Sequence, residues 1–531
     1  MHPVETLEMI LALLGAAIVL HLIAARLKLP PSAALLIGGG AIAFAPGLPA
    51  IALDPELILV LFLPPLLFDG AYYTAFGRFR RHLPGILSLA VGAVLFTAAV
   101  VAIVAHWLVP TLPWAACLAL GAIVSPPDAI AARAVLQRVN LPRRLQALLE
   151  GESLLNDATG LVLFRFAVAA TLIGSFSTGE AVGSFFLLGI GGVAVGAVVA
   201  AAWMFVIRRL NDETLIVASS TLLCWAAYIA GEALHVSGVI STVTAGIAFG
   251  WYQHSLLPAR VRLQGSAFWR ILAFTLEALI FILMGFSLRG ALDRVGGFGE
   301  VIATLAVPAL LITATVIVAR IIWVAGAEAL LVGLRRTGFR SARPLGWRQA
   351  GVLSWAGMRG VVTLAVALSL PTNFPARDLM LVAAFAVILV TVVLQGGTLG
   401  TVIRLLQPND RDALAPLALP DAEAAVARAK LHAAEEVAYG QDGQLVHPQL
   451  LETYRSRAVG TERYAQDAGG FMDRIQPHFD LVLHVIAAGR AELLRLHREG
   501  QIEDEVLHDL ERDLDLEEVG VIFQRGDSPA R

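Results

Sequence analysis

The stretch WAACLALGAIVSPPDAIAARAVLQ, residues 114–137, combines the two features that decide the fold of this chain. Its length and apolar character match the ~20 residues that a helix needs to cross a bilayer. Midway it carries the sequence SPPD at residues 125–128, and two prolines interrupt a helix. Apolar stretches of this length recur as far as about residue 405. The sequence therefore predicts an all-α polytopic membrane protein that contains a broken helix.

The composition of the whole chain supports this interpretation. Of 531 residues, 57% are hydrophobic and 15% charged, and the mean hydropathy is +0.74. Soluble domains have about 25% charged residues, so an ordinary soluble enzyme is excluded. Basic residues outnumber acidic ones before residue 404 and acidic residues dominate after it, which places the two parts in different environments. Cys117 and Cys224 lie in apolar runs and are expected to be small core residues.

About thirteen membrane-spanning helices are expected, with the first retained rather than cleaved. Lys and Arg concentrate in the loops after odd-numbered spans, which predicts an N-terminus outside and a C-terminus in the cytoplasm. The expected spans are 5–25, 31–50, 52–70, 82–109, 114–137, 147–174, 182–207, 213–232, 236–252, 266–288, 300–332, 347–370 and 378–405.

Thirteen spans permit two six-helix repeats of inverted orientation, separated by the seventh span. The fifth and twelfth spans then occupy corresponding positions, and the twelfth is also interrupted, by WAGMRG at residues 355–360. Paired broken helices in two repeats indicate a substrate site. The alternative is that proline and glycine are common in transmembrane helices in general.

Carboxylates cluster beside the first break. Asp128 lies ~21 Å along its span, and Asp157 lies ~15 Å into the next span from the opposite side of the membrane, so both reach a similar middle depth. By the i,i+4 rule, Ser153 shares a helix face with Asp157, and Glu152 shares the adjoining face with Asn156. Such oxygen atoms suit a hard cation. Because two buried carboxylates repel each other, a cation and a proton should compete for the site, and this competition constitutes exchange.

A compensating positive charge is available in the second broken span. Arg359 remains charged, and Glu152 lies one turn from the carboxylate site. We expect these two residues to form an ion pair. Either the pair takes part in the site, or it only braces the broken helices.

Four segments resemble a known family. The runs LPPLLFDG at 63–70, SPPDA at 125–129, GESLLNDA at 151–158 and GMRG at 357–360 are similar to the signature segments of bacterial sodium/proton exchangers of the cation:proton antiporter type one family. The resemblance covers nearly all of residues 1–405. It implies a homodimer with a dimerisation domain and a mobile core domain that carries crossing, unwound helices. The transported Na⁺ or Li⁺ and H⁺ are the only small partners it implies, with no cofactor.

The resemblance also implies roles for individual residues of the cation site. Asp157 becomes the principal cation and proton carboxylate, Asp128 and Ser153 become neighbouring Na⁺ ligands, and Asn156 organises the crossing. Asp69 matches an acidic position that faces the site through water.

Three further features follow from the same resemblance. Glu152 and Arg359 match the structural ion pair of the family, and the pairing of Asn156 with Asp157 is typical of electroneutral members. Pro127 departs from the commonest pattern, which has threonine, so that a hydroxyl is lost although the backbone carbonyl could still coordinate.

Two other charges lie inside expected spans. We suggest that Arg165 and Glu277 pair with each other; alternatively, each finds a backbone carbonyl or a water-filled crevice. Beyond the exchanger domain, 1–405, a linker at 406–420 leads to a cytosolic helical domain at 421–531. Its helices are expected from Asp421, from 467 to 499 and, after a turn at Gly500, from 503 to 518. This acidic tail either brakes transport or is a solvated helical hairpin.

The sequence thus predicts an electroneutral Na⁺(Li⁺)/H⁺ antiporter of the bacterial inner membrane, and not an enzyme. The partners expected are the ions, the lipid bilayer and a second copy, and not a nucleic acid. A K⁺/H⁺ antiporter, a cation channel and a sensor built on an exchanger scaffold remain the alternatives. A primary pump is disfavoured because no nucleotide-binding glycine loop is present.

Overall fold

The computed structural model describes residues 3–27, 31–43, 55–128, 141–173, 178–295, 299, 304–339, 343–408, 419–439 and 444–525. The chain forms two compact units, Met1–Arg411 and Asp412–Arg531. Within the described ranges both units are built from helices, and extended backbone is limited to one bridge between Tyr439 and Leu445. The predicted all-α fold is confirmed.

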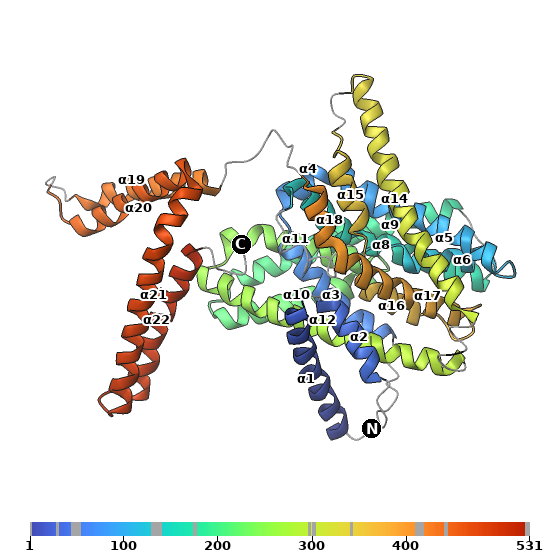
Figure 1. Ribbon diagram of the computed structural model, residues 1–531, viewed down its shortest axis with the longest axis horizontal. Coiled ribbons are helices and arrows are strands. Elements are labelled where there is room, and N and C mark those ends of the chain that lie inside the picture. Colours follow the sequence, from blue (N-terminus) through green and yellow to red (C-terminus); the bar gives the residue numbers. More distant parts are fainter. Residues whose placement is uncertain are drawn as a thin grey trace. The chain divides into compact units, whose positions relative to one another are not determined.

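Helices from two parts of the chain pack into a first bundle in unit 1. They are apolar on most of their circumference because their outer faces suit lipid rather than water. One buried cluster around Phe68, Phe249 and Trp269 belongs to this bundle alone. Its members, seen in Figure 1, are α1 (Pro3–Leu27), α2 (Pro31–Ala43), α3 (Pro55–Tyr72), α9 (Thr178–Ile207), α10 (Glu213–Ala233), α11 (Gly238–Leu256) and α12 (Ala259–Val295).

The remaining helices of unit 1 form a second bundle. A separate buried cluster around Leu120, Val316 and Val387 fills it. A third cluster includes residues of both bundles and joins them. The second bundle consists of α4 (Phe76–Leu87), η1 (Ser88–Ala93), α5 (Val94–Leu108), α6 (Trp114–Val124), α8 (Arg143–Ile173), α14 (Ala306–Arg336), α15 (Trp347–Trp355), α16 (Val361–Leu368), α17 (Arg377–Val390), η2 (Thr391–Gly396) and α18 (Gly397–Leu406).

Both predicted helix breaks are present. Helix α6 ends at Val124, and residues 125–128 continue as irregular chain. Residues 356–360 separate α15 from α16. Two further helices are continuous but contain a π-helical turn, η1 and η2, a local widening that is frequent at functional sites.

Seven helices among the described residues are long and apolar enough to cross a membrane, and four shorter apolar helices accompany them. The count of thirteen spans and their division into inverted repeats stay predictions. Several boundaries were wrong: the spans expected from 147 and 266 begin earlier, at Arg143 in α8 and at Ala259 in α12. Arg78, Arg80 and Arg81 lie in the expected loop before a span at 82–109, whereas α4 begins at Phe76 and contains them. Long basic side chains at a helix end can keep their charge in water, so a helix can begin before these arginines and include them.

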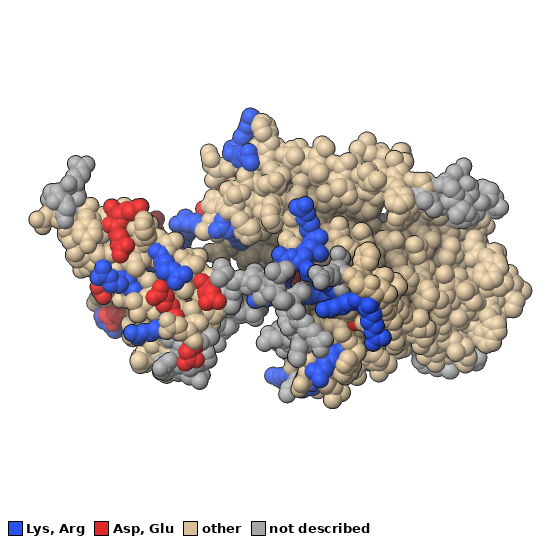
Figure 2. Space-filling view, turned by 90° about the horizontal axis from the view of Figure 1, so that it is seen from above, with Lys and Arg blue, Asp and Glu red and all other residues tan. Residues whose placement is uncertain are grey.

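Arginine-rich segments meet at one end of the second bundle. In Figure 1, α4, the end of α14 and α15 lie at the top of unit 1. Figure 2, seen from above, shows Lys and Arg side chains gathered on this face. The exposed arginines of α4, of the end of α14 and of the chain that leads into and begins α15 are Arg80, Arg81, Arg335, Arg336, Arg343 and Arg348. We call this end the Arg-rich face.

The described residues of unit 2 form four helices: α19 (Leu419–Ala438), α20 (Pro448–Gln466), α21 (Ala468–Arg498) and α22 (Asp504–Arg525). The two helices predicted around Gly500 correspond to α21 and α22, and this glycine has a φ of +69° in the turn between them. Helix α20 was missed. Few of its residues are apolar, and only Leu451 and Ala458 are buried.

Candidate functional site

The two broken helices meet through their backbones. The N–H of Asp128, four residues after α6 ends, donates a hydrogen bond of 2.6 Å to the carbonyl of Met358 between α15 and α16. Interrupted helices leave backbone groups without helical partners, and here one break partly satisfies the other. The predicted crossing of the two breaks is therefore present.

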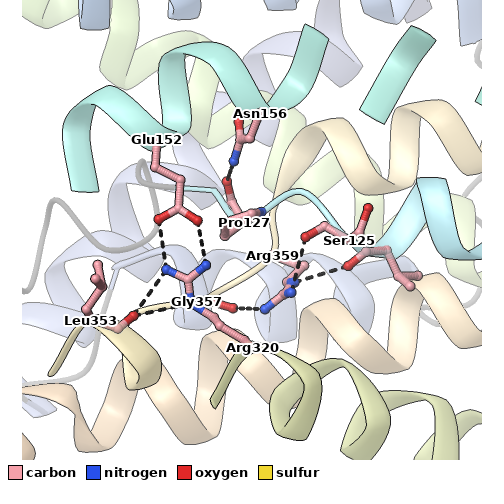
Figure 3. Close-up of polar contacts among 9 residues, drawn as sticks. Ser125, Pro127, Glu152, Asn156, Arg320, Leu353, Gly357 and Arg359 are labelled. Atoms are coloured by element: carbon pink, nitrogen blue, oxygen red, sulfur yellow. Dashed lines mark hydrogen bonds and ion pairs between the residues drawn. The ribbon is translucent and has the colours of Figure 1, made fainter. Parts of the chain in front are cut away.

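Arg359 holds the end of α6. Its Nε donates to the carbonyl of Val124 at 3.1 Å and its Nη2 to the carbonyl of Ser125 at 3.2 Å. Its Nη1 donates to the carbonyl of Gly357, and its backbone N–H donates to Oγ1 of Thr391 in η2 at 3.0 Å. A guanidinium at the C-terminal end of a helix opposes the negative end of the helix dipole. Arg359 thus opposes the partial negative charge at the broken end of α6; its contacts with Ser125 and Gly357 are drawn in Figure 3.

The partner predicted for Glu152 was wrong. Its carboxylate accepts two hydrogen bonds from Arg320 of α14, at 2.6 and 2.8 Å, rather than from Arg359. The side chains of Glu152 and Arg320 are each 2% exposed. In Figure 3, Arg320 lies between Glu152 and the carbonyl of Leu353, to which its Nε and Nη2 donate at 3.2 and 3.1 Å. Arg320 was missed, although a lone arginine within the apolar span 300–332 was a usable signal.

Asn156 joins α8 to the first break. Its Nδ2 donates to the carbonyl of Pro127, and both residues are buried. The backbone oxygen of Pro127 thus already accepts one hydrogen bond, while the Oδ1 atom of Asn156 is buried in the same region. This arrangement fits the organising role expected of Asn156.

The expected cation ligands lie around the crossing. Asp157 is 8% exposed, and Asp128 is close enough to affect it electrostatically. Asp128 and Ser153 are half-buried. A Cβ at Gly360 would overlap the carboxylate of Asp128, so only glycine lets the second break approach this side chain. Three of the sequence motifs therefore converge on the two carboxylates.

Asp69, the expected water-mediated neighbour, lies on α3 of the first bundle. Its side chain is 6% exposed. Helix α3 packs against both α8 and α16 of the second bundle. Asp69 therefore belongs to the helix that faces the crossing from the opposite bundle.

Arg165 has a different partner from the one predicted. It forms an ion pair of 3.0 Å with Glu232 near the end of α10, rather than with Glu277. The pair connects the second bundle to the first. Glu277 is half-buried on α12. The side chains of Arg165 and Glu232 are 56% and 35% exposed, so this pair is far more accessible than that of Glu152.

Comparison with known proteins identifies the family. Residues 10–405 match the family described as sodium/hydrogen exchanger, transmembrane. The chain belongs to this family. It is 34% identical over 533 residues to an uncharacterised Na⁺/H⁺ exchanger of Mycobacterium tuberculosis, covering 97% of this chain and 96% of the relative.

Two other relatives of this exchanger add detail. A sodium, potassium, lithium and rubidium/H⁺ antiporter of Bacillus pumilus is 31% identical over 493 residues, 88% of this chain and 71% of that protein. The solved structure of the sodium proton antiporter MjNhaP1 from Methanocaldococcus jannaschii has a TM-score of 0.62 at 20% identity, covering 77% of this chain and 100% of that one. The chain is thus a multi-pass membrane protein of an antiporter family with the same fold.

Proposed function

We propose that this exchanger is an electroneutral Na⁺(Li⁺)/H⁺ antiporter that works by alternating access, with Asp157 and Asp128 as its shared anionic site. The observation that carries the proposal is the position of Asp157, buried beside Asp128 where two broken helices cross. A buried carboxylate pair is most stable when a proton or a cation neutralises it. Exchange of one for the other couples their transport.

The two buried arginines support this assignment. Arg320 bonds to Glu152 and to a backbone carbonyl, and Arg359 bonds to backbone carbonyls. Their guanidinium groups therefore stabilise the helices around the crossing. In this proposal Ser153 supplies a further oxygen ligand for Na⁺, Asn156 positions the carbonyl of Pro127, and Asp69 acts through water.

K⁺/H⁺ exchange is the second candidate function. It is favoured by the Bacillus pumilus relative, whose name includes potassium and rubidium. Oxygen ligands suit either ion, because selectivity depends on the size of the cavity rather than on the ligand types.

The membrane arrangement forms part of the proposal. The Arg-rich face lies in the cytoplasm of a bacterial inner membrane, following the preference of Lys and Arg for that side. The N-terminus then lies outside, and the exchanger works as a homodimer.

Proteoliposomes with an internal pH dye and a clamped membrane potential test the function. Na⁺ and K⁺ gradients are imposed on the parent protein and on Asp157→Asn. We expect Na⁺-driven proton movement in the parent, independent of the clamped potential, and none in the variant. Asp212→Asn is the control, because Asp212 caps the first turn of α10 in the other bundle.

The outcomes separate the candidates. Proton movement driven only by K⁺ would establish the second candidate. Cation flux without proton movement would indicate a channel, and no flux of either kind would indicate a sensor. Exchange at the parent rate in Asp157→Asn would refute the assigned site.

A further inference from the structure

Helix α15 is a short element with an important position. It has nine residues, Trp347–Trp355, and a helix of this length is not stable in isolation. Its N-cap, Gly346, has no side chain and a φ of +86°. The backbone N–H groups at the start of α15 and the carbonyl groups at its end have no partner within the helix, so they need partners from elsewhere in the fold.

The N-terminal end of α15 is held by Glu328 of α14. One carboxylate oxygen accepts the N–H of Leu345 at 2.8 Å, and the other accepts the N–H of Gly346 at 2.7 Å. Glu328 therefore serves as a cap supplied by a neighbouring helix. Its negative charge at the start of α15 is also favourable to the helix dipole.

The C-terminal end of α15 is held by the same neighbouring helix. The carbonyl of Leu353 accepts two hydrogen bonds from Arg320. Arg320 and Glu328 are eight residues apart in α14, ~12 Å along the helix, and the nine residues of α15 extend ~13 Å. The two charges of α14 thus match the length of α15 and carry the signs that its two ends favour.

A second helix, α8, holds the segment of chain that leads into α15. Arg144, at the start of α8, donates to the carbonyl of Arg343 at 2.6 Å and to that of Pro344 at 3.3 Å. Residues 343–346 are therefore anchored by α8 on one side and by α14 on the other. The same two helices carry the buried pair of Glu152 and Arg320.

Helix α15 is connected to the cation site by a short segment of chain. Three residues after α15 ends, the carbonyl of Met358 accepts the backbone N–H of Asp128. A displacement of α15 along its axis would move this carbonyl and with it Asp128. We propose that Glu328 is a positioning residue for the cation site, which holds α15 at the depth where Met358 fixes Asp128. This inference rests on the proposed antiport function.

The test compares Glu328→Gln with the parent in the proteoliposome assay. Glutamine keeps the size but loses the charge and one of the two acceptor oxygens. We expect the apparent KM for Na⁺ to rise about fivefold, the order of effect expected for a charged helix cap, while Vmax stays within about twofold. Glu328→Asp keeps the charge and should raise KM less. Glu213→Gln is the matched control, because Glu213 lies in the first turn of α10 in the first bundle.

Each outcome supports or overturns the inference. An unchanged KM in Glu328→Gln, with or without a loss of folded protein, would show that Glu328 only braces the fold. If that variant does not fold, Arg144→Gln is measured instead, with a rise in KM expected and an unchanged KM overturning the inference. A parent protein without Na⁺-driven proton movement would refute the proposed function itself, which is a separate result.

Discussion

Replacing Glu152 by glutamine should destabilise the exchanger strongly. The change leaves the guanidinium of Arg320, 2% exposed, without the carboxylate that accepts its bonds at 2.6 and 2.8 Å. Removing one partner of a buried ion pair costs about 3–5 kcal/mol. Since glutamine can still accept one hydrogen bond, and Leu353 accepts two others, we expect the lower end, about 3 kcal/mol.

The assay is unfolding in mixed micelles titrated with SDS and followed by tryptophan fluorescence. Glu232→Gln is the control, because it breaks an accessible ion pair worth below about 1 kcal/mol. A double-mutant cycle should give a larger coupling energy between Glu152 and Arg320 than between Glu152 and Arg359. The reasoning is refuted if Glu152→Gln costs no more than the control, or if Arg359 shows the larger coupling.

Two further substitutions test the crossing. Gly360→Ala should abolish Na⁺-driven proton movement, because the added Cβ would overlap the carboxylate of Asp128, whereas Gly397→Ala, whose Cβ would meet open space, should retain it. A normal rate in Gly360→Ala would contradict the observed approach of the two breaks. Asn156→Ala should lower the free energy of unfolding by about 1–3 kcal/mol, because it leaves the buried carbonyl of Pro127 without its donor. Equal stability of this variant and the parent in the same SDS titration would show that the hydrogen bond contributes little.

The sequence predicted the two helix breaks well, and it placed the expected cation ligands beside the first break, in both cases for local reasons. Proline and glycine interrupt a helix wherever they occur in it, so the breaks at 125–128 and 356–360 could be located from the chain alone. The helical period likewise places Ser153, Asn156 and Asp157 along adjoining faces of α8. Neither inference depends on which helices become neighbours.

Helix ends and the less apolar tail were harder to predict. The start of α4 was placed six residues late, because Arg78, Arg80 and Arg81 resemble a loop, although their charges can reach water from a helix end. Helix α20 was missed because its apolar residues are few. In both places the local sequence is compatible with more than one structure.

What the sequence by itself determined is therefore the class of the molecule: a helical membrane protein with two broken helices and buried carboxylates. The tertiary structure alone decided which charges pair. Glu152 and Arg320 are 168 residues apart, and Arg165 and Glu232 are 67 apart. Charge and depth made Arg359 an equally reasonable partner for Glu152. Only the packing of α8, α14 and α15 brings Arg320 to the carboxylate and turns Arg359 toward backbone carbonyls. A hydrogen bond joins atoms about 3 Å apart, and the position of a residue along a span, as read from the sequence, is far less precise than that.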